Sequence, residues 1–292
     1  MKTSFHRQTT SDNLILQGLL YEPEQKTNKL ILHIHGMAGN FYENRFLDYM
    51  AKTFTKNGYA FLAVNTRGHD YIADFPIAGD KEDDIRIGNV FEKFEECVLD
   101  IKCWMDFAAK KFSQITLQGH SLGCSKVVYY LSETKDKRVK NLSLASPTDM
   151  VGMIERWSGS KQTAELSKKR VSEGKGEEIF PKVLGDWAYL SASTYLNFVT
   201  RGNSIDIFNT YAKHTRSIAL ESIKIPTLAF FGTGDDICIT KTPKEALEII
   251  KSKAKNCPKF DIEVIKDAPH SYFNHEQEVT DLILNWLKNT NS

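Results

Sequence analysis

The chain has 292 residues, of which 41% are hydrophobic and 26% are charged, and its formal net charge at pH 7 is +1. This composition describes a soluble globular protein with enough residues for one large domain or two small ones. The lysine and arginine residues are dispersed along the chain, so neither a nucleic acid nor an anionic membrane is expected as its main partner.

The cysteines and the N-terminal segment bear on cofactors and location. The five cysteines are an odd number and contain no C-x-x-C pair, so we expect neither a disulfide framework nor a structural zinc site. The N-terminus, MKTSFHRQTTSDN, lacks the apolar region of a signal peptide. No apolar run approaches the ~18 residues needed to span a bilayer. We therefore expect a cytoplasmic protein without a membrane span.

Strands and helices alternate along most of the chain. The first 23 residues predict a β-hairpin that Pro23 ends. The strands predicted after it are 29–36, 59–68, 114–121, 139–147, 225–236 and 260–270. The predicted helices lie near residues 43–57, 91–111, 122–134, 243–255 and 276–289. Near-continuous apolar strands separated by helices indicate an α/β fold, with a mostly parallel central sheet flanked by helices.

Residues 149–222 interrupt this alternation. They contain no apolar strand, only helix-like stretches rich in aromatic residues, Trp187 among them. A segment of this length is too long for a plain connection. We therefore predict a helical cap, or lid, inserted between two strands of a core formed by residues 1–148 and 223–292. The alternative is a set of helices that only thickens the fold.

Residues 115–126 read ITLQGHSLGCSK and contain a G-x-S-x-G pattern centred on Ser121. A predicted strand precedes the pattern and a predicted helix follows it, which is the context that such a nucleophile turn requires. Turning from strand to helix at one residue strains the backbone of the serine, and the small residues Gly119 and Gly123 relieve the crowding. Ser121 would then stand at a helix N-terminus, where the amide dipoles favour developing negative charge.

Two further reactive groups follow predicted strands. In an open parallel sheet, functional groups gather beyond the carboxyl ends of the strands. The pair Asp235–Asp236 and then His270 occupy such positions, in the chain order Ser, Asp, His. A serine hydroxyl needs an adjacent base to be a good nucleophile at neutral pH, and an aspartate can hold that base in the right tautomer.

Each of these two positions has a rival. Asp235 and Asp236 are adjacent, so their side chains diverge and only one of them can face His270. His275 could replace His270, but it lies where a helix is predicted to begin, with Asn274 as its cap, whereas His270 directly follows a strand.

This set of residues resembles the α/β-hydrolase superfamily, over nearly the whole chain outside the cap. The resemblance makes Ser121 the nucleophile and His270 the base. It makes Asp235 the orienting acid, since the family pattern G-x-x-D fits Gly232–Asp235, although Asp236 then stands where the family often has proline.

The resemblance also implies an oxyanion hole and a narrower branch. The loop His35-Gly36-Met37 would be the oxyanion loop, with the backbone amides of Met37 and Leu122 as the two donors. The segments FYENRFLDYM, NTRGHD and FEKFEECVLDI are similar to a branch of the superfamily that includes siderophore esterases.

The remaining charged and histidine residues are assigned structural roles. His33 and His35 share a strand face, but no carboxylate or cysteine lies at matching spacing nearby, so we expect no metal and no other cofactor. His35 is expected to shape the loop before Gly36, and His33 to be a core residue with satisfied hydrogen bonds. Glu92 and Glu95 are expected on the solvated face of a helix.

The predicted reaction is acyl transfer to water. The leading hypothesis is hydrolysis of a small-molecule carboxylic ester through an acyl-enzyme intermediate. Thioesters, lactones and amides use the same machinery, and the motifs do not separate them. The aromatic residues of the cap favour a partly apolar substrate. The alternatives are a non-catalytic binding module with the same fold, and lyase or cofactor-free peroxidase chemistry. No oligomeric state is predicted.

Overall fold

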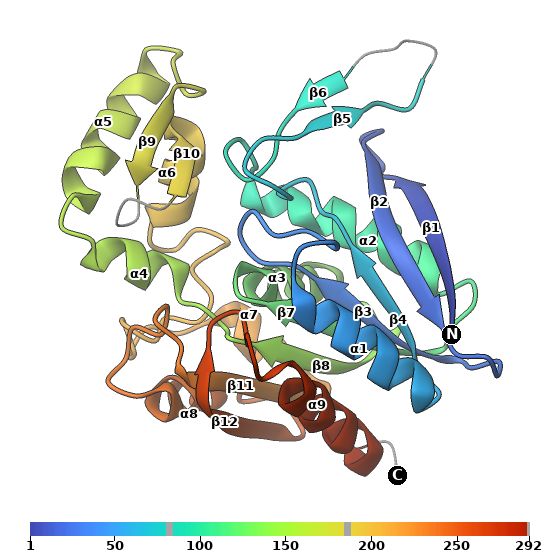
Figure 1. Ribbon diagram of the computed structural model, residues 1–292. Helices are drawn as coiled ribbons and strands as arrows, with labels where there is room; N and C mark the ends of the chain where they lie inside the picture. Colours follow the sequence, from blue (N-terminus) through green and yellow to red (C-terminus); the bar gives the residue numbers. More distant parts are fainter. Residues whose placement is uncertain (80–83, 184–187, 291–292) are drawn as a thin grey trace.

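The computed structural model describes residues 1–79, 84–183 and 188–290, so the predicted cap residue Trp187 lies outside the described residues. The centre of the molecule is an eight-stranded sheet with the strand order β1-β2-β4-β3-β7-β8-β11-β12 (Figure 1). Its strands are β1 (Lys2–Thr9), β2 (Ile15–Glu22), β3 (Lys29–Ile34), β4 (Ala60–Val64), β7 (Gln114–His120), β8 (Val139–Ala145), β11 (Thr227–Gly234) and β12 (Phe260–Pro269).

The sheet is mostly parallel, as predicted. All pairs from β4 through β12 are parallel, whereas β1 and β2 form an antiparallel hairpin at one edge. Every residue of β4 is buried, and all but the first residue of β3 are buried. Strands that are covered on both faces explain the continuous apolar runs in the sequence.

Helices cover both faces of the sheet (Figure 1). The helices α1 (Arg45–Lys56) and α9 (Glu276–Thr290) pack with one cluster of buried side chains. The helices α2 (Cys97–Ala108), α3 (Leu122–Thr134) and α8 (Pro243–Lys253) pack with the other cluster. The expected helices are therefore present, but α2 begins six residues later than the predicted start at residue 91, after a short 3₁₀ turn at Phe94–Glu96.

Most of the chain between β8 and β11 forms a separate group of elements beside the sheet (Figure 1). This group contains α4 (Met150–Arg156), α5 (Ser160–Ser172), β9 (Ile179–Val183), β10 (Ala188–Ser191) and α6 (Ala192–Val199). The short helix α7 (Ile218–Glu221), which precedes β11, packs instead against α3 and α8 of the core. The antiparallel pair β9–β10 differs from the all-helical segment expected here. Strands of five and four residues are too short to give a clear alternating pattern.

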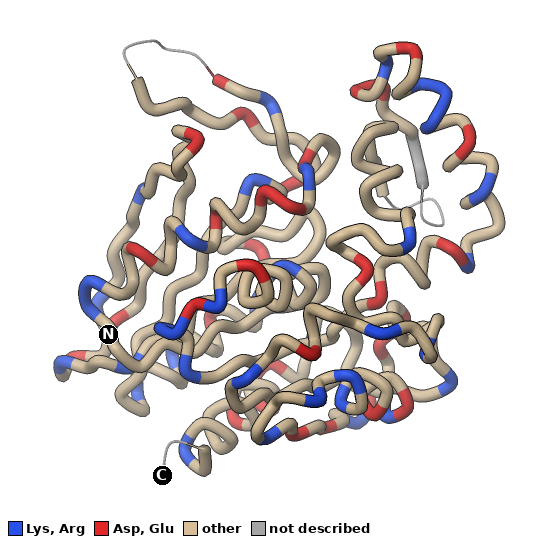
Figure 2. Tube along the Cα trace, turned by 180° about the vertical axis from the view of Figure 1, so that it is seen from behind, with Lys and Arg blue, Asp and Glu red and all other residues tan. Residues whose placement is uncertain are grey.

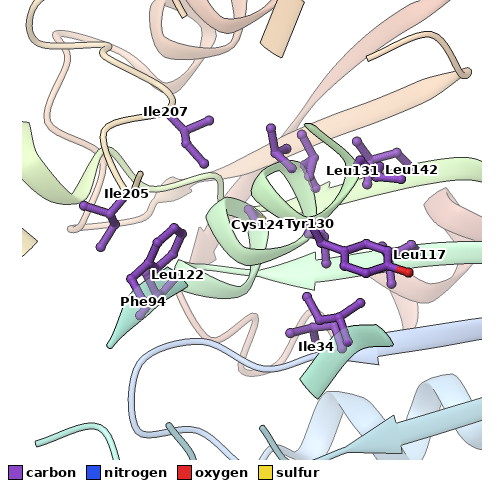
Figure 3. Close-up of a cluster of buried hydrophobic side chains, with 14 of the residues drawn as sticks. Ile34, Phe94, Leu117, Leu122, Cys124, Tyr130, Leu131, Leu142, Ile205 and Ile207 are labelled. Atoms are coloured by element: carbon purple, nitrogen blue, oxygen red, sulfur yellow. The ribbon is translucent and has the colours of Figure 1, made fainter. Parts of the chain in front are cut away.

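Two features tie the inserted segment to the core. The amide of Ser191 donates to the carbonyl of Val90 at 2.9 Å, and the hydroxyl of Thr194 donates to the carbonyl of Glu92 at 3.2 Å. Apolar side chains add to these bonds. Figure 3 shows Ile205 and Ile207, which follow α6, in the same buried cluster as Leu122 of α3. The segment is thus joined to the core beside the start of α3.

A second small antiparallel pair, β5 (Asp74–Pro76) and β6 (Asp84–Arg86), was not predicted. Figure 2 shows basic and acidic residues interspersed along the described parts of the chain. Within the described residues, no helix is both long enough and apolar enough to cross a membrane.

Candidate active site

Ser121 stands in the turn between β7 and α3, with φ of 55° and ψ of −124°. A positive φ is uncommon for a residue with a side chain, and such strain persists only where the surroundings enforce it. Here the amide of Ser121 donates to the carbonyl of Ala145 on β8 at 2.9 Å. The sheet therefore holds the serine in this conformation, and its side chain is half-buried.

The two flanking glycines are required by close backbone contacts. A Cβ atom on Gly123 would lie 2.3 Å from the carbonyl oxygen of Ile34, and one on Gly119 would lie 2.5 Å from the carbonyl carbon of Gly123. Both distances are far below an ordinary contact, so a side chain at either position would push α3 away from β3 and β7. The local sequence thus permits the helix to start directly after Ser121.

Asp235 and His270 lie together at the carboxyl ends of β11 and β12. The ring Nδ1 of His270 is 3.0 Å from each carboxylate oxygen of Asp235. The side chain of Asp235 is fully buried, whereas that of His270 is 22% exposed. The pair therefore combines a partly exposed imidazole ring with a carboxylate that solvent does not reach.

A second serine, Ser146, supports Asp235. Its Oγ donates to Asp235 Oδ2 at 2.6 Å and lies 2.8 Å from the hydroxyl of the buried Tyr272. The amide of Ile237 donates to Asp235 Oδ1 at 3.0 Å. Burial opposes the charge of Asp235, but the bonds from His270, Ser146 and Ile237 outweigh it and hold the pKa below its usual value.

Sequence reasoning missed Ser146 and Tyr272. Ser146 follows β8 directly and has a positive φ of 53°. A survey of the carboxyl end of every strand would have drawn attention to Ser146, because β8 lies next to β11 in the sheet. No sequence signal marks Tyr272.

The rival residues lie elsewhere. Asp236 is exposed and Asp235 is the residue that meets His270. The Nδ1 of His275 is 2.9 Å from Glu278 on α9. Asp236 therefore does not replace Asp235 beside His270, and His275 pairs with Glu278 instead of Asp235.

His120, the residue before Ser121, contacts His270. The Nε2 of His120 donates to the carbonyl of His270 at 2.9 Å, and the two rings are 5.0 Å apart between centroids. Burial, together with the charge of His270, lowers the pKa of His120 to about 4, so that its ring is neutral at pH 7.

Among the hydrogen bonds of the described residues, none joins Ser121 Oγ to the ring of His270. Such bonds are often long in free enzymes and shorten when substrate binds.

The loop after β3 lies directly against Ser121. A Cβ atom on Gly36 would be 2.8 Å from the Cβ and 3.3 Å from the Oγ of Ser121. The amide of Gly39 donates to the carbonyl of Gly36 at 3.2 Å and closes a turn around Met37. Leu122 is the first residue of α3, where a backbone amide has no acceptor within its own helix.

The two histidines of β3 differ in their surroundings. His35 bonds to Thr66 and to the carbonyl of Gly36, as expected of a residue that shapes this loop. His33 was expected to be satisfied, but neither of its ring nitrogens has a partner in the described structure. Its ring packs instead against those of Phe46 and Phe61, and burial lowers its pKa to about 3. The described residues include no group of three potential metal ligands.

Glu92 also differs from its expected place. It was predicted on a solvated helix face, but it precedes α2 and is only 1% exposed. Its Oε2 accepts a hydrogen bond of 2.7 Å from Nζ of Lys126 on α3, whose side chain is fully buried. Glu95 is partly buried and accepts from Asn197 at 3.1 Å.

The buried His33 predicts a loss of stability in acid. Its folded pKa lies below the unfolded value, so between pH 6.5 and about 3 the unfolded chain binds a proton that the folded chain does not. Stability therefore falls as the pH falls, by about 1.4 kcal/mol per pH unit from this group. The variant His33→Leu removes this dependence. Between pH 7.5 and pH 5, we expect the free energy of unfolding of His33→Leu to fall by about 2 kcal/mol less than that of wild type. The measurement is urea unfolding at both pH values. Parallel losses in the two proteins would contradict this expectation.

Comparisons with known proteins identify a family and a set of similar folds. The family model described as serine aminopeptidase, S33 matches residues 25–277. No curated protein gives a significant match. An esterase of Pyrococcus furiosus has a TM-score of 0.64 at 18% identity, over 99% of this chain and 91% of that chain.

Two other solved structures resemble the chain over almost its whole length. The esterase Est1E of Butyrivibrio proteoclasticus, with ferulic acid bound, has a TM-score of 0.63 at 18% identity, over 97% of this chain and 98% of that chain. The α/β hydrolase GrgF of Penicillium sp. sh18 has a TM-score of 0.71 at 17% identity, over 99% of both chains. At such identities these similarities establish the fold alone.

Proposed function

Since the chain belongs to the serine aminopeptidase S33 family of α/β hydrolases, we propose that it cleaves carboxylic esters of small molecules through an acyl-enzyme intermediate. The proposal rests above all on one observation: a strained serine at a helix start and a buried Asp235–His270 pair occupy the same edge of one sheet. Ser121 is proposed as the nucleophile, His270 as the base and Asp235 as the orienting acid.

The proposed reaction proceeds in two halves. His270 takes the proton from Ser121 Oγ as this oxygen attacks the carbonyl carbon of the ester. His270 then returns the proton to the leaving alkoxide, and the acyl group stays on Ser121. A water molecule repeats the attack with the same base, which releases the acid and regenerates the serine. Asp235 stabilises the imidazolium formed in each half, and its low pKa keeps it charged.

The backbone amides of Met37 and Leu122 are proposed to hold the oxyanion. Leu122 follows Ser121 directly, and Met37 follows Gly36, which contacts Ser121. Backbone donors that are in place before the reaction need no reorganisation, and each contributes about 2.7–4 kcal/mol in other enzymes.

Residues 149–222 are proposed to act as the cap that selects the substrate. The segment joins the core at Val90 and Glu92, beside the start of α3. It brings aromatic side chains such as Tyr189 to this region, where the ring of Tyr189 is 5.7 Å from that of Tyr71. An ester with an aryl or other partly apolar group is the proposed substrate class.

Amide hydrolysis is the second candidate, because the family model is described as an aminopeptidase. The ester proposal is supported by two of the similar structures being esterases, one of them with ferulic acid bound. Thioester and lactone hydrolysis would use the same residues.

A panel of p-nitrophenyl esters, acyl thioesters, lactones and aminoacyl p-nitroanilides tests the proposal. We expect the highest kcat/KM for an ester, and no turnover of any substrate by Ser121→Ala. A fluorophosphonate probe should label the wild type at Ser121 and leave Ser121→Ala unlabelled. Higher kcat/KM for anilides would favour the peptidase candidate, and an unlabelled wild type would remove the serine-hydrolase proposal.

A further inference from the structure

A buried ion pair lies behind the proposed oxyanion loop. Lys126 of α3 and Glu92 are 0% and 1% exposed at their side chains, and their Nζ and Oε2 atoms are 2.7 Å apart. Neither residue belongs to the proposed triad or to the loop. Lys126 lies on α3, five residues after Ser121, and Glu92 precedes α2, which raises the question of what the pair does.

A chain of hydrogen bonds leads from this pair to the loop. Lys126 Nζ donates to Thr66 Oγ1 at 3.4 Å, and Thr66 Oγ1 lies 3.0 Å from His35 Nε2. The amide of Thr66 also donates to this nitrogen at 3.0 Å. The other ring nitrogen, Nδ1 of His35, is 2.8 Å from the carbonyl oxygen of Gly36.

The chemistry of the groups gives the chain one direction. An ammonium group can only donate, so Thr66 Oγ1 accepts from Lys126 and uses its own proton toward His35. The backbone N–H of Thr66 also donates to His35 Nε2, so this nitrogen is an acceptor, and the single proton of a neutral ring lies on Nδ1, which donates to the carbonyl of Gly36. Burial, aided by the charge of Lys126, holds the pKa of His35 well below its usual value, which keeps the ring neutral.

The last bond of the chain orients a catalytic group. In a planar trans peptide, the carbonyl of Gly36 and the N–H of Met37 point in opposite directions. His35 at 2.8 Å and the amide of Gly39 at 3.2 Å both bond to the Gly36 oxygen, and they thereby turn the Met37 N–H to the opposite side. Gly36 itself lies against Ser121, so a rotation of this peptide would move an oxyanion donor.

We propose that Lys126, held by Glu92, is a positioning residue that fixes the Gly36–Met37 peptide through Thr66 and His35. This inference rests on the proposed role of Met37 in the oxyanion hole. The energetics agree with a role beyond packing. Burying an ion pair costs more desolvation free energy than burying a well-packed apolar pair of similar volume. In addition, Glu92 Oε1 has no hydrogen-bond partner in the described structure.

A double-mutant cycle separates positioning from packing. The first change is Thr66→Val, which removes the hydroxyl but keeps the backbone N–H. The second is Lys126→Met with Glu92→Gln, which removes both charges together and so avoids leaving one buried charge unpaired. The matched control is Ser125→Ala, a buried neighbour of Lys126 on the same helix whose Oγ has no partner in the described structure.

If the chain of bonds acts as proposed, each change lowers kcat for a p-nitrophenyl ester about 10-fold with KM changed less than twofold. The two changes combined cost no more than either alone, because the chain is broken once. Ser125→Ala keeps the wild-type kcat. Unchanged kcat in the Lys126→Met/Glu92→Gln variant, or losses that multiply to about 100-fold, would overturn the inference.

A second readout does not depend on turnover. The ¹⁵N resonance of His35 Nε2 reports its acceptor bonds, and it should shift in Thr66→Val and also in Lys126→Met/Glu92→Gln, although neither of the latter residues touches His35. An unchanged resonance in the charge-free variant would reject the chain of bonds. Absence of Ser121-dependent ester turnover in the wild type would instead reject the proposed function, so the two failures are distinguishable.

Discussion

Replacing Ser121 by alanine is expected to lower kcat for ester hydrolysis by about 10⁵- to 10⁶-fold. The hydroxyl is the atom that forms the bond to the acyl carbon in the proposed reaction, and no neighbouring group can replace it. Cys124 is the cysteine nearest to Ser121 in the sequence, but its Sγ donates to the carbonyls of Gly119 and Ala145. Burial raises the pKa of this thiol far above its usual value, so it stays protonated. The measurement is the initial rate with p-nitrophenyl acetate.

The control for this variant is the integrity of the fold. Alanine has the same backbone strain at φ of 55° as serine, so the thermal unfolding midpoint of Ser121→Ala should stay close to that of wild type. A folded Ser121→Ala protein that retains more than a few per cent of the rate would show that another residue is the nucleophile.

The second large effect is expected at Asp235. The variant Asp235→Asn should lower kcat by about 10⁴-fold, with a small change in KM. An asparagine can turn its NH₂ toward His270 Nδ1, which favours the ring tautomer that carries the proton on Nε2 and cannot accept one from Ser121. The Ser146 hydroxyl, 2.6 Å from Asp235 Oδ2, can still donate to the remaining amide oxygen. The measurement is kcat and KM across the pH range.

The adjacent aspartate provides a matched control. Asp236 has the same charge and lies one residue further along, but it is exposed. Asp236→Asn should keep kcat within about twofold of wild type, because a surface charge that makes no contact with the ring contributes little. The opposite ranking of the two variants would transfer the orienting role to Asp236 and contradict the geometry on which the proposal rests.

Local sequence patterns were sufficient to predict the main secondary-structure elements of this protein and their α/β arrangement. The parallel strands, the N-terminal hairpin and the helices on both faces follow from apolar periodicity, and the structure has each of them. The positions of Ser121, Asp235 and His270 were predicted from strand ends, because the carboxyl ends of parallel strands meet at one edge. The pattern could not say which aspartate faces the histidine, since that depends on how the chain turns after β11.

The sequence by itself determined what each short stretch can do: form a strand, start a helix after Ser121, or end a strand with a reactive group. Only the tertiary structure decided which distant residues meet. Glu92 and Lys126 are 34 residues apart and read locally as ordinary charged residues, yet both are buried and paired. Ser146 meets Asp235 across 89 residues, and His33 is enclosed by aromatic rings without a partner. Burial and pairing depend on contacts between segments that only the folded chain brings together, and no local pattern carries that information.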